Sequence, residues 1–456
     1  MPERYLEKAR YGVRMLLLSL RAEPRWTDAA GLTGGGIYYG SEPERADASA
    51  WRIGLLPATV AFFDGNAPGP PSKRIVTIGG REVPVLFEGG GDADFDLVAA
   101  CFYLLSGWQE WRTRSRDEHG RFPFVESVQE RLDFITLPAV ELYRQLALAS
   151  LRKRGLDPQT KTWGEASWSF CPTHDVDYLR KWRPGILYRE IVTRGTLNRG
   201  REPVRARVGR VGAALSGLVQ PGDPYRNALS RMRNEVLRRG GKATYFFKAA
   251  ARGPYDVGYA PDGSFIQQCF LELRSADFEI ALHPSYHAYN HGRYVREEQA
   301  ALSRATGLPA TSVRTHYLRF DPGLTPVILE EAGFRIDSTL AFAEKAGFRR
   351  GTCLPFPFYD LAADRALDLW EMPLSVMEST LFNRERLNGA GAREATRRIM
   401  EICRAFDGVF VGLWHNILWD ESDAPGWGAH FTATLDEAAA EGARIDTLRG
   451  ALQAWR

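Results

Sequence analysis

The pattern of hydrophobic and polar positions divides the chain into two parts near residue 160. In the first part, short β-like runs surround glycine turns, and longer stretches carry apolar residues at helical spacing. The predicted elements are strands at 74–78 and 83–87 around the Gly79–Gly80 turn, and helices at 95–111 and 138–151. This mixture predicts a smaller α+β accessory domain over residues 1–160.

From about residue 163 the pattern changes, and β-like runs alternate with amphipathic helices. Strands are predicted at 166–170, 243–247, 278–282 and 409–413, and helices at 225–239, at 325–332 and at the C-terminus. Alternation of this kind implies a parallel sheet, and over this length a (β/α) barrel is the simplest closed solution. The fold class predicted for residues 161–456 is therefore α/β.

Composition favours a globular protein of more than one domain. The chain has 456 residues, of which 44% are hydrophobic and 25% charged, close to the average of globular domains. The apolar run at 15–20 lies between Arg14 and Arg21 and is too short for a secretory signal or a membrane span. Five scattered cysteines without a CxxC pair favour a reducing compartment, so we expect a cytoplasmic protein.

The net charge of +3 is small, but positive residues concentrate in an insertion at about 180–222. The basic side chains there are Arg180, Lys181, Arg183, Arg189, Arg194, Arg199, Arg201, Arg205, Arg207 and Arg210. One interpretation is a solvated arginine face; the other is docking to an anionic glycan, a lipid-linked glycan or a membrane surface. No nucleic-acid recognition motif accompanies the charge, so no nucleic acid is expected as a partner.

Polar residues that suit catalysis follow several of the predicted strands, where a (β/α) barrel collects its active site. Asp175 and Asp177 are two residues apart, so strand alternation places both carboxylates on one face. His283 and His287 would lie on one face of a helical turn and could share a cation. Taken alone, an Asp-x-Asp pair more often caps a turn.

Two further groups complete this set. Arg314 can lower the pKa of nearby carboxylates and orient them, although a structural ion pair is an equal reading. His415 ends an apolar strand, where a solitary histidine is more often a core residue than a catalyst. Together, the groups supply two histidines and one carboxylate for a divalent metal, with a spare carboxylate and imidazole for proton transfer.

In this order the motifs resemble those of the polysaccharide deacetylases, carbohydrate esterase family four. Thr173–Asp177 is similar to a variant of the family's Thr-Phe-Asp-Asp-Gly motif, and His283–His287 matches its His-x-x-x-His motif. Arg314–Tyr317 matches Arg-Pro-Pro-Tyr in outline. Gly333–Thr339 looks like the family's Gly-Phe-x-x-Asp-Ser segment, and Val411–His415 fits its last motif. The resemblance covers about residues 165–456 and implies a distorted (β/α) barrel.

The resemblance also implies an activity: hydrolysis of the N-acetyl group of an amino sugar or glycan. The implied ligands of the metal, zinc or another divalent ion, are Asp177, His283 and His287. Asp175 would be the general base, Arg314 would orient it, and His415 would be the general acid. The implied substrate-binding residues are Tyr317, Trp370, Trp414 and His316.

Departures from the family pattern keep alternatives open. The glycine after the paired Asp is absent, so the roles of Asp175 and Asp177 could be exchanged, and the extra imidazoles of His174 and His316 could alter ligation. The other functions considered are a catalytically inactive carbohydrate-binding or lipid-linked-glycan-binding protein and an amidohydrolase for a non-sugar amide.

Overall fold

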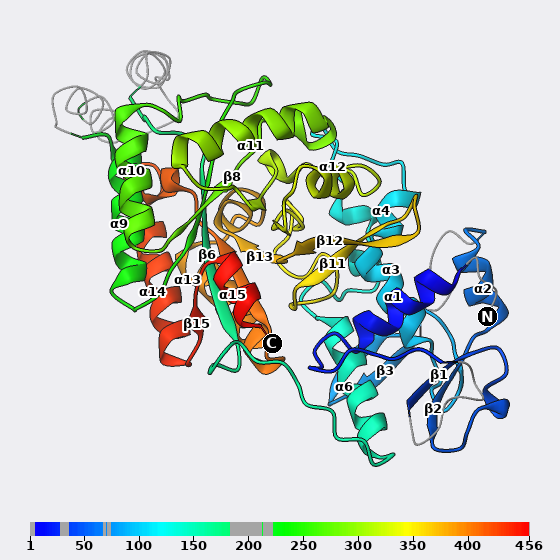
Figure 1. The fold of residues 1–456 in the computed structure, drawn as a ribbon. Helices are drawn as coiled ribbons and strands as arrows, with labels where there is room; N and C mark the ends of the chain where they lie inside the picture. The colour runs from blue at the N-terminus through cyan, green and yellow to red at the C-terminus, as the bar shows by residue number, and fades with distance from the viewer. Residues whose placement is uncertain are drawn as a thin grey trace, which may run out of the picture.

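A curved, mostly parallel β-sheet forms the centre of the larger part of the molecule (Figure 1). The computed structural model describes residues 5–27, 36–66, 70, 74–182, 212 and 222–455. In spatial order the strands are β11 (Phe356–Asp360), β12 (Arg365–Glu371), β10 (Ile336–Asp337), β9 (Ser312–Val313), β8 (Glu279–Leu282), β7 (Thr244–Phe247), β6 (Ser169–Val176), β14 (Val409–Leu413) and β13 (Leu374–Met377). The short β15 (Arg444–Ile445) also pairs with β6. Among the described strand pairs of this sheet, only β11–β12 is antiparallel.

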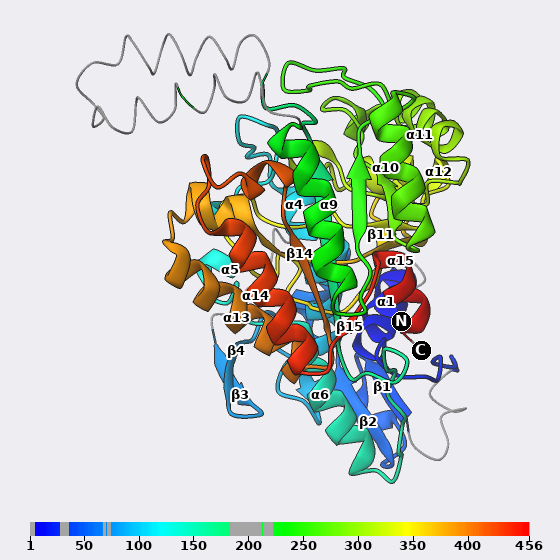
Figure 2. The same cartoon turned by 90° about the vertical axis from the view of Figure 1, so that its left-hand side faces the viewer.

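Helices alternate with these strands and cover the outside of the sheet (Figures 1 and 2). They are α9 (Pro224–Leu237), α10 (Ser264–Ser275), α11 (Gly292–Thr306), α12 (Thr325–Glu331), α13 (Gly389–Ala405), α14 (Trp427–Ala440) and α15 (Leu448–Ala454). Every residue of β6 and β14 is buried, as expected for parallel strands covered on both faces. The predicted α/β barrel is confirmed, in a distorted form whose strand path is open between β11 and β13 among the described residues.

Single-turn helices shape the loops at the carboxyl ends of the strands. They are the 3₁₀ helices η5 (Ala288–Asn290), η6 (His316–Leu318) and η8 (Asn416–Trp419) and the π-helix η7 (Thr380–Arg384). The barrel helices themselves begin at local signals. Asp223 caps α9 by accepting a hydrogen bond from the Tyr225 amide, and Pro224 occupies the first helical position.

The N-terminal part lies beside β11 and β12 and has mixed α and β structure, as predicted (Figure 1). Its elements are α1 (Leu6–Leu16), β1 (Gly36–Gly40), η2 (Pro43–Arg45), β2 (Ala50–Gly54), α2 (Pro57–Phe63), β3 (Ile75–Ile78), β4 (Arg81–Pro84), β5 (Gly90–Gly91), α3 (Leu97–Ser106), α4 (Trp108–Arg112), η3 (Phe124–Glu126), α5 (Val128–Arg131) and α6 (Ala139–Arg152). The predicted hairpin is present as β3–β4. Its turn residues Gly79 and Gly80 both have positive φ, which suits a two-residue hairpin loop.

One predicted helix is divided in two. Residues 95–111 form α3 and α4 because Gly107 between them adopts φ +80°, outside the helical region. A side chain at Gly107 would also meet the guanidinium of Arg350, since a Cβ there would lie 2.6 Å from its nitrogens. The sequence shows the helical spacing but not this tertiary contact, which requires a glycine.

The two parts of the chain pack against each other through buried side chains. The Tyr11 hydroxyl of α1 donates a hydrogen bond to the Pro357 carbonyl of β11, and Glu110 of α4 pairs with Arg349 and Arg350. One cluster of buried apolar residues includes members of both parts. The division of the chain into domains at residue 160 stays a prediction.

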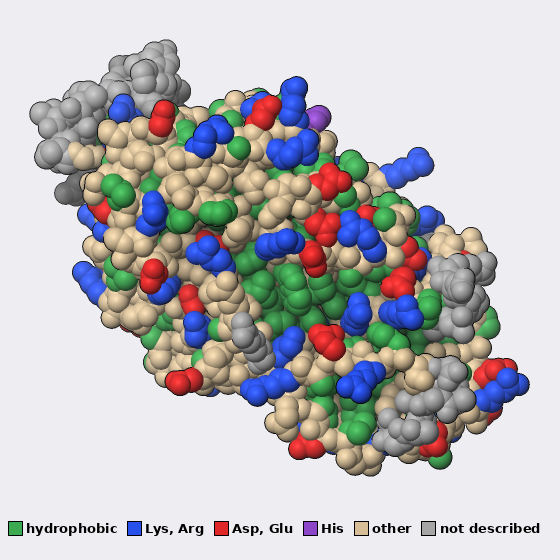
Figure 3. Space-filling view, viewed as in Figure 1, with side chains coloured by type: hydrophobic (Ala, Val, Ile, Leu, Met, Phe, Trp, Pro, Cys, Tyr) green, Lys and Arg blue, Asp and Glu red, His purple; other side chains and the backbone are tan. Residues whose placement is uncertain are grey.

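The face of the molecule shown in Figure 3 carries scattered charge rather than one strongly charged patch. In the view of Figure 3, Lys, Arg, Asp and Glu side chains alternate, and hydrophobic side chains gather in the middle over β11, β13 and α15. Most of the arginine-rich insertion at 180–222 lies outside the described residues, so the predicted docking role stays a prediction. Among the described residues, no helix is long and apolar enough to cross a membrane.

Candidate active site at the carboxyl ends of the strands

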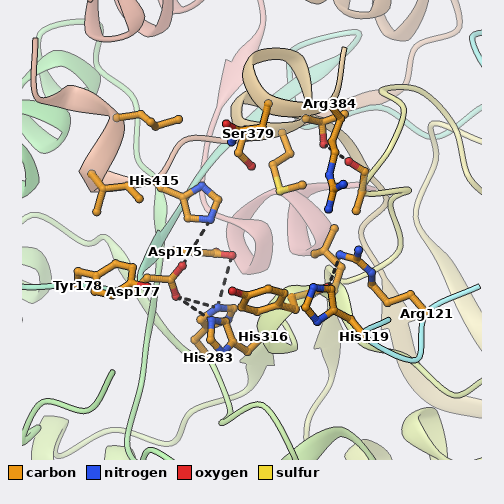
Figure 4. Close-up of a pocket in the computed structure, with 18 residues that line it drawn as sticks. His119, Arg121, Asp175, Asp177, Tyr178, His283, His316, Ser379, Arg384 and His415 are labelled. Carbon is orange, nitrogen blue, oxygen red and sulfur yellow. Dashed lines mark hydrogen bonds and ion pairs between the residues drawn. The ribbon is translucent and has the colours of Figure 1, made fainter. Parts of the chain in front are cut away.

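The site is a pocket of about 480 Å³ at the carboxyl ends of the parallel strands. This volume is in the range typical of small-ligand sites. The lining residues are His119, Arg121, Asp175, Asp177, Tyr178, His283, His316, Tyr317, Leu318, Ala343, Met377, Ser379, Thr380, Asn383, Arg384, His415, Ile417 and Leu418. Figure 4 shows Asp175 and Asp177 between His415 on one side and His283 with His316 on the other.

Asp175 and Asp177 reach the pocket together because β6 is extended up to Val176. Alternation along the strand sends both carboxylates to one side, as their spacing predicts. His174 points the other way and packs between Tyr245 and Phe431, with Nδ1 2.9 Å from the Trp414 carbonyl oxygen. Burial lowers the pKa of His174 to about 3, so it is a neutral core residue and not part of the site.

Asp177, His283 and His316 form a compact cluster of possible metal-binding atoms. Asp177 Oδ1 lies 3.4 Å from Nε2 of His283 and 3.4 Å from Nε2 of His316. The three ligand atoms lie within 4.8 Å of one another. The two histidines come from different loops, which follow β8 and β9 and are brought together by the parallel sheet.

In both histidines, the ring nitrogen that faces away from Asp177 has a hydrogen-bond partner, and this orients the other nitrogen for binding a cation. Nδ1 of His283 lies 2.6 Å from the Arg314 carbonyl oxygen, and Nδ1 of His316 lies 2.7 Å from Oδ1 of Asp256. Each Nδ1 therefore carries the proton and each Nε2 offers its lone pair, an arrangement typical of metal-ligating histidines. Burial lowers the pKa of His316, against the opposing effect of Asp177 and Asp256, which favours its neutral form.

The donor set fits a divalent metal ion. Two imidazole nitrogens and one carboxylate oxygen suit zinc and leave coordination positions open. Asp177 Oδ1 is buried and lies 3.4 Å from Nε2 of each histidine, so it can share a metal ion with them. Burial works against the charge on Asp177, but the Lys248 ammonium and the nearby imidazoles hold its pKa well below the ordinary range.

Arg314 holds Asp175 from behind the pocket. Its side chain is fully buried, and its Nη1 donates to Asp175 Oδ1 at 3.0 Å and to Thr173 Oγ1 at 2.8 Å. Nε and Nη2 donate to the carbonyl and hydroxyl oxygens of Ser338. With four hydrogen bonds, the guanidinium fixes one oxygen of Asp175 and leaves the other, Oδ2, 3.8 Å from His283 Nε2.

His415 faces Asp177 across the pocket and is held by a buried carboxylate. Its Nδ1 lies 2.7 Å from Glu378 Oε1, and its Nε2 lies 3.8 Å from Asp177 Oδ2. Burial opposes the charged imidazolium, but Glu378, Asp177 and Asp175 together raise the pKa of His415 to about 9. His415 is therefore protonated at neutral pH and has a proton to give.

Lys248 contributes a buried positive charge to the cluster. Directly after β7, its side chain is 1% exposed, and Nζ lies 3.2 Å from Asp177 Oδ1 and 3.2 Å from His316 Nε2. Asp256 Oδ1 lies 4.0 Å from the same nitrogen. Lys248 thus contacts two of the three possible metal ligands.

His287, predicted from its spacing as the second histidine ligand, does not join the cluster. The helical turn that would place it above His283 is not formed, because residues 283–285 have no regular structure and a turn precedes η5. Ser285 donates hydrogen bonds from both its amide and its hydroxyl to Glu298, which directs the chain away from the cluster. The histidine that lies in this place is His316, which the sequence suggested for the substrate.

Of the other predicted substrate contacts, only Tyr317 lines the pocket. Trp414 is fully buried and packs against His430 and Phe431 on the opposite side of β14. Trp370 lies on β12 with its ring 6.3 Å from that of Trp455. Trp414 is therefore a core residue, and Trp370 is a half-buried residue outside the pocket.

Several residues of the site were not singled out from the sequence. Lys248 and Glu378 directly follow β7 and β13, so their position at strand ends was a usable signal. Asp256 lies in a loop with no such signal. His119 and Arg121 come from the N-terminal part, where no motif marks them.

The N-terminal segment 117–121 closes one wall of the pocket. Nη1 of Arg121 donates to the Tyr317 carbonyl oxygen at 3.1 Å, and Nε of Arg319 donates to the His119 carbonyl oxygen at 2.7 Å. Tyr317 and Leu318 have φ of +62° and +55°, a strained conformation for residues with side chains. The segment therefore supports the turn that carries His316.

Comparison with protein families gives a match in the N-terminal part of the chain. A family of unknown function (DUF7033) matches residues 50–155. No curated protein matches the chain.

Solved structures with some similarity include three from bacteria. A protein from Mycobacterium smegmatis described as a polysaccharide deacetylase is 17% identical over 63% of this chain and 90% of its own, with a TM-score of 0.40. The peptidoglycan deacetylase PdaC from Bacillus subtilis is 10% identical over 63% and 91%, with a TM-score of 0.31. A pseudoenzyme of the CE4 family from Bacillus anthracis is 9% identical over 62% and 65%, with a TM-score of 0.32. At these values, similarity establishes neither the activity nor the functional residues of this chain.

Proposed function

We propose that this protein is a metal-dependent hydrolase that removes the N-acetyl group from an amino sugar or glycan. One observation carries the proposal: the cluster of Asp177, His283 and His316 lies in the same pocket as Asp175 and His415. Arg314 holds Asp175 from behind the pocket, and Glu378 holds His415. A possible metal site, a base and an acid are thus assembled around one cavity, which a binding module does not need.

In this proposal the metal ligands are Asp177, His283 and His316, with zinc the simplest choice of ion. A divalent cation held there would polarise the acyl carbonyl and make a water molecule more acidic. The geometry supports the assignment of Asp177 to the metal and Asp175 to the base, because Asp177 joins the imidazoles while Asp175 is held by Arg314.

The protein's own residues then move two protons. Asp175 accepts a proton from the attacking water as the water oxygen bonds to the acyl carbon, and Arg314 keeps its carboxylate aimed at the pocket. His415 gives the proton on Nε2 to the amide nitrogen as the carbon–nitrogen bond breaks. The products are acetate and a free amine, and Glu378 holds the ring of His415 in place throughout.

The chemistry of the pocket supports a sugar as the substrate. Tyr178 and Tyr317 offer aromatic faces on which a sugar ring can pack, and Ser379, Asn383 and His119 supply polar groups for hydroxyls. The predicted contact with an anionic or lipid-linked glycan through the 180–222 insertion stays part of this proposal.

Metal content and acetate release test the function together. We expect about one zinc ion per chain in the wild type, and acetate release from N-acetylated amino sugars or their oligomers. His283→Ala and His316→Ala should lose the metal and roughly 100-fold or more of the turnover, because each removes a ligand. His287→Ala is the matched control, a nearby histidine outside the cluster, and should keep both.

Other outcomes would overturn the proposal in defined ways. Full zinc content in His283→Ala would place the metal elsewhere. Acetate release from small amides but from no sugar would identify an amidohydrolase of another substrate class. Glycan binding that is insensitive to chelators and is accompanied by no turnover would identify a binding protein.

A further inference from the structure

Lys248 lies at the cluster although a metal site of this ligand set does not require it. Its ammonium lies 3.2 Å from His316 Nε2, within hydrogen-bond distance, and 3.2 Å from Asp177 Oδ1. The side chain is 1% exposed, so water cannot replace these contacts. A buried ammonium without partners would be costly, and these two atoms, with Asp256 nearby, are what stabilises it.

His316 Nε2 and Asp177 Oδ1 are also the atoms that would bind the metal, and His316 Nε2 cannot bind the ammonium and the metal at the same time. Nδ1 of His316 is committed to Asp256, so Nε2 has a single lone pair in the ring plane. An ammonium that donates to this lone pair excludes a metal from it. The charge around the cluster leads to the same conclusion, because Lys248 supplies the positive charge that Asp177 and Asp256 need when no metal is bound.

We infer that Lys248 is a built-in cation that competes with the divalent metal for His316 and Asp177. In the metal-free protein the ammonium bonds to Nε2 of His316 and compensates the buried Asp177. Metal binding displaces it toward Asp256, whose Oδ1 is 4.0 Å away in this structure. The inference rests on the proposed function, because it takes the cluster to be the metal site.

Two consequences follow from this competition. The natural chain should bind zinc more weakly than its ligand set alone would allow, because binding includes the displacement of the ammonium. The metal-free protein should stay folded, because its buried carboxylate keeps a counter-charge.

The test compares zinc affinities of metal-free, full-length proteins by competition with a chromophoric chelator. Lys248→Met keeps the length of the side chain and removes its charge, and it should bind zinc roughly tenfold or more tightly than the wild type. Lys242→Met is the matched control: Lys242 lies just before the same strand, far from the cluster, and pairs with Asp277 at the surface. It should match the wild type.

Thermal unfolding gives a second readout that does not depend on activity. Without metal, Lys248→Met should unfold at a lower temperature than the wild type, and zinc should raise its melting temperature by more than that of the wild type. If Lys248→Met does not fold without metal, Lys248→Gln, which can still donate one hydrogen bond, replaces it in both measurements.

The outcomes separate this inference from the proposed function. Equal or weaker zinc binding by Lys248→Met would overturn the competition and leave metal-dependent hydrolysis intact. Zinc binding by Lys248→Met but not by the wild type would support the competition and overturn metal-dependent activity of the natural chain. No binding by either protein would overturn both.

Discussion

Individual side chains in this protein have their charge states set by what surrounds them. His415 and His430 both lie near Trp414 but have opposite environments: Glu378 raises the pKa of His415 to about 9, whereas burial lowers the pKa of His430 to about 4. His430 lies between the rings of Trp414 and Trp427, and its Nε2 is 3.1 Å from the Thr396 hydroxyl. One imidazole is therefore held charged and the other neutral.

The lowered pKa of His430 predicts that the protein becomes less stable as the pH falls. The folded-state pKa of His430 is about 4, below the ordinary value of 6.5, so the unfolded chain takes up the proton first as the pH falls. The stability that neutral His430 provides is complete above pH 6.5 and is lost as the pH falls toward 4, by up to about 3 kcal/mol. Urea unfolding at pH 7 and pH 4.5 should show a smaller loss in His430→Gln than in the wild type.

The control for this measurement is His291→Gln, which changes an exposed histidine. It should lose as much stability as the wild type over the same pH range. An equal loss in all three proteins would mean that other groups, such as the buried His174, dominate the acid response.

At the scale of elements, the site depends on a turn that local preferences do not favour. Tyr317 and Leu318 in η6 adopt left-handed backbone angles, and that turn carries His316 into the cluster. Arg121 and Arg319 tie the turn to the N-terminal part through two backbone carbonyl oxygens. The N-terminal part therefore helps to shape the site as well as to wall it.

Arg121→Ala should therefore impair function without removing the metal ligands. Loss of its hydrogen bond to the Tyr317 carbonyl lets the turn relax, and a small displacement near a reacting group can cost roughly tenfold to 100-fold in rate. We expect kcat/KM for acetate release to fall by about tenfold, with zinc content unchanged. Arg114→Ala, which changes an exposed arginine three residues before the 117–121 segment, should behave as the wild type. Wild-type kinetics in Arg121→Ala would show that the turn keeps its conformation without the Arg121 hydrogen bond.

For the whole molecule, a buried ion cluster connects the two parts of the chain. Glu110 is fully buried in α4, where its carboxylate lies 2.8 Å from Arg349 and 3.3 Å from Arg350, both in the barrel. Burial disfavours the charge of Glu110, but Arg349 and Arg350 lower its pKa below the ordinary value. Removing one member of such a cluster leaves buried charges without compensation.

Glu110→Gln should therefore destabilise the protein by about 3–5 kcal/mol, as measured by urea unfolding at pH 7. The exposed pair of Glu394 and Arg397 provides the control, since Glu394→Gln should change the free energy of unfolding by less than about 1 kcal/mol. A similar small effect of both substitutions would mean that the two parts do not depend on this cluster.

The sequence by itself determined the features that depend on local geometry. The β/α alternation gave the barrel, the Gly79–Gly80 turn gave its hairpin, and the two-residue spacing of Asp175 and Asp177 placed both carboxylates on one side of β6. These follow from strand alternation and turn chemistry, which act over a few residues. The position of His415 at the pocket follows in the same way from the end of β14.

Only the tertiary structure decided which side chains meet. His287 and His316 were both near the predicted site in sequence, but the missing helical turn after His283 leaves His287 outside, and the turn held by Arg121 brings His316 in. Lys248 and Asp256 join the cluster from separate segments. Residue spacing specifies the direction of a side chain along its own strand, whereas contacts between strands depend on the path of every loop between them.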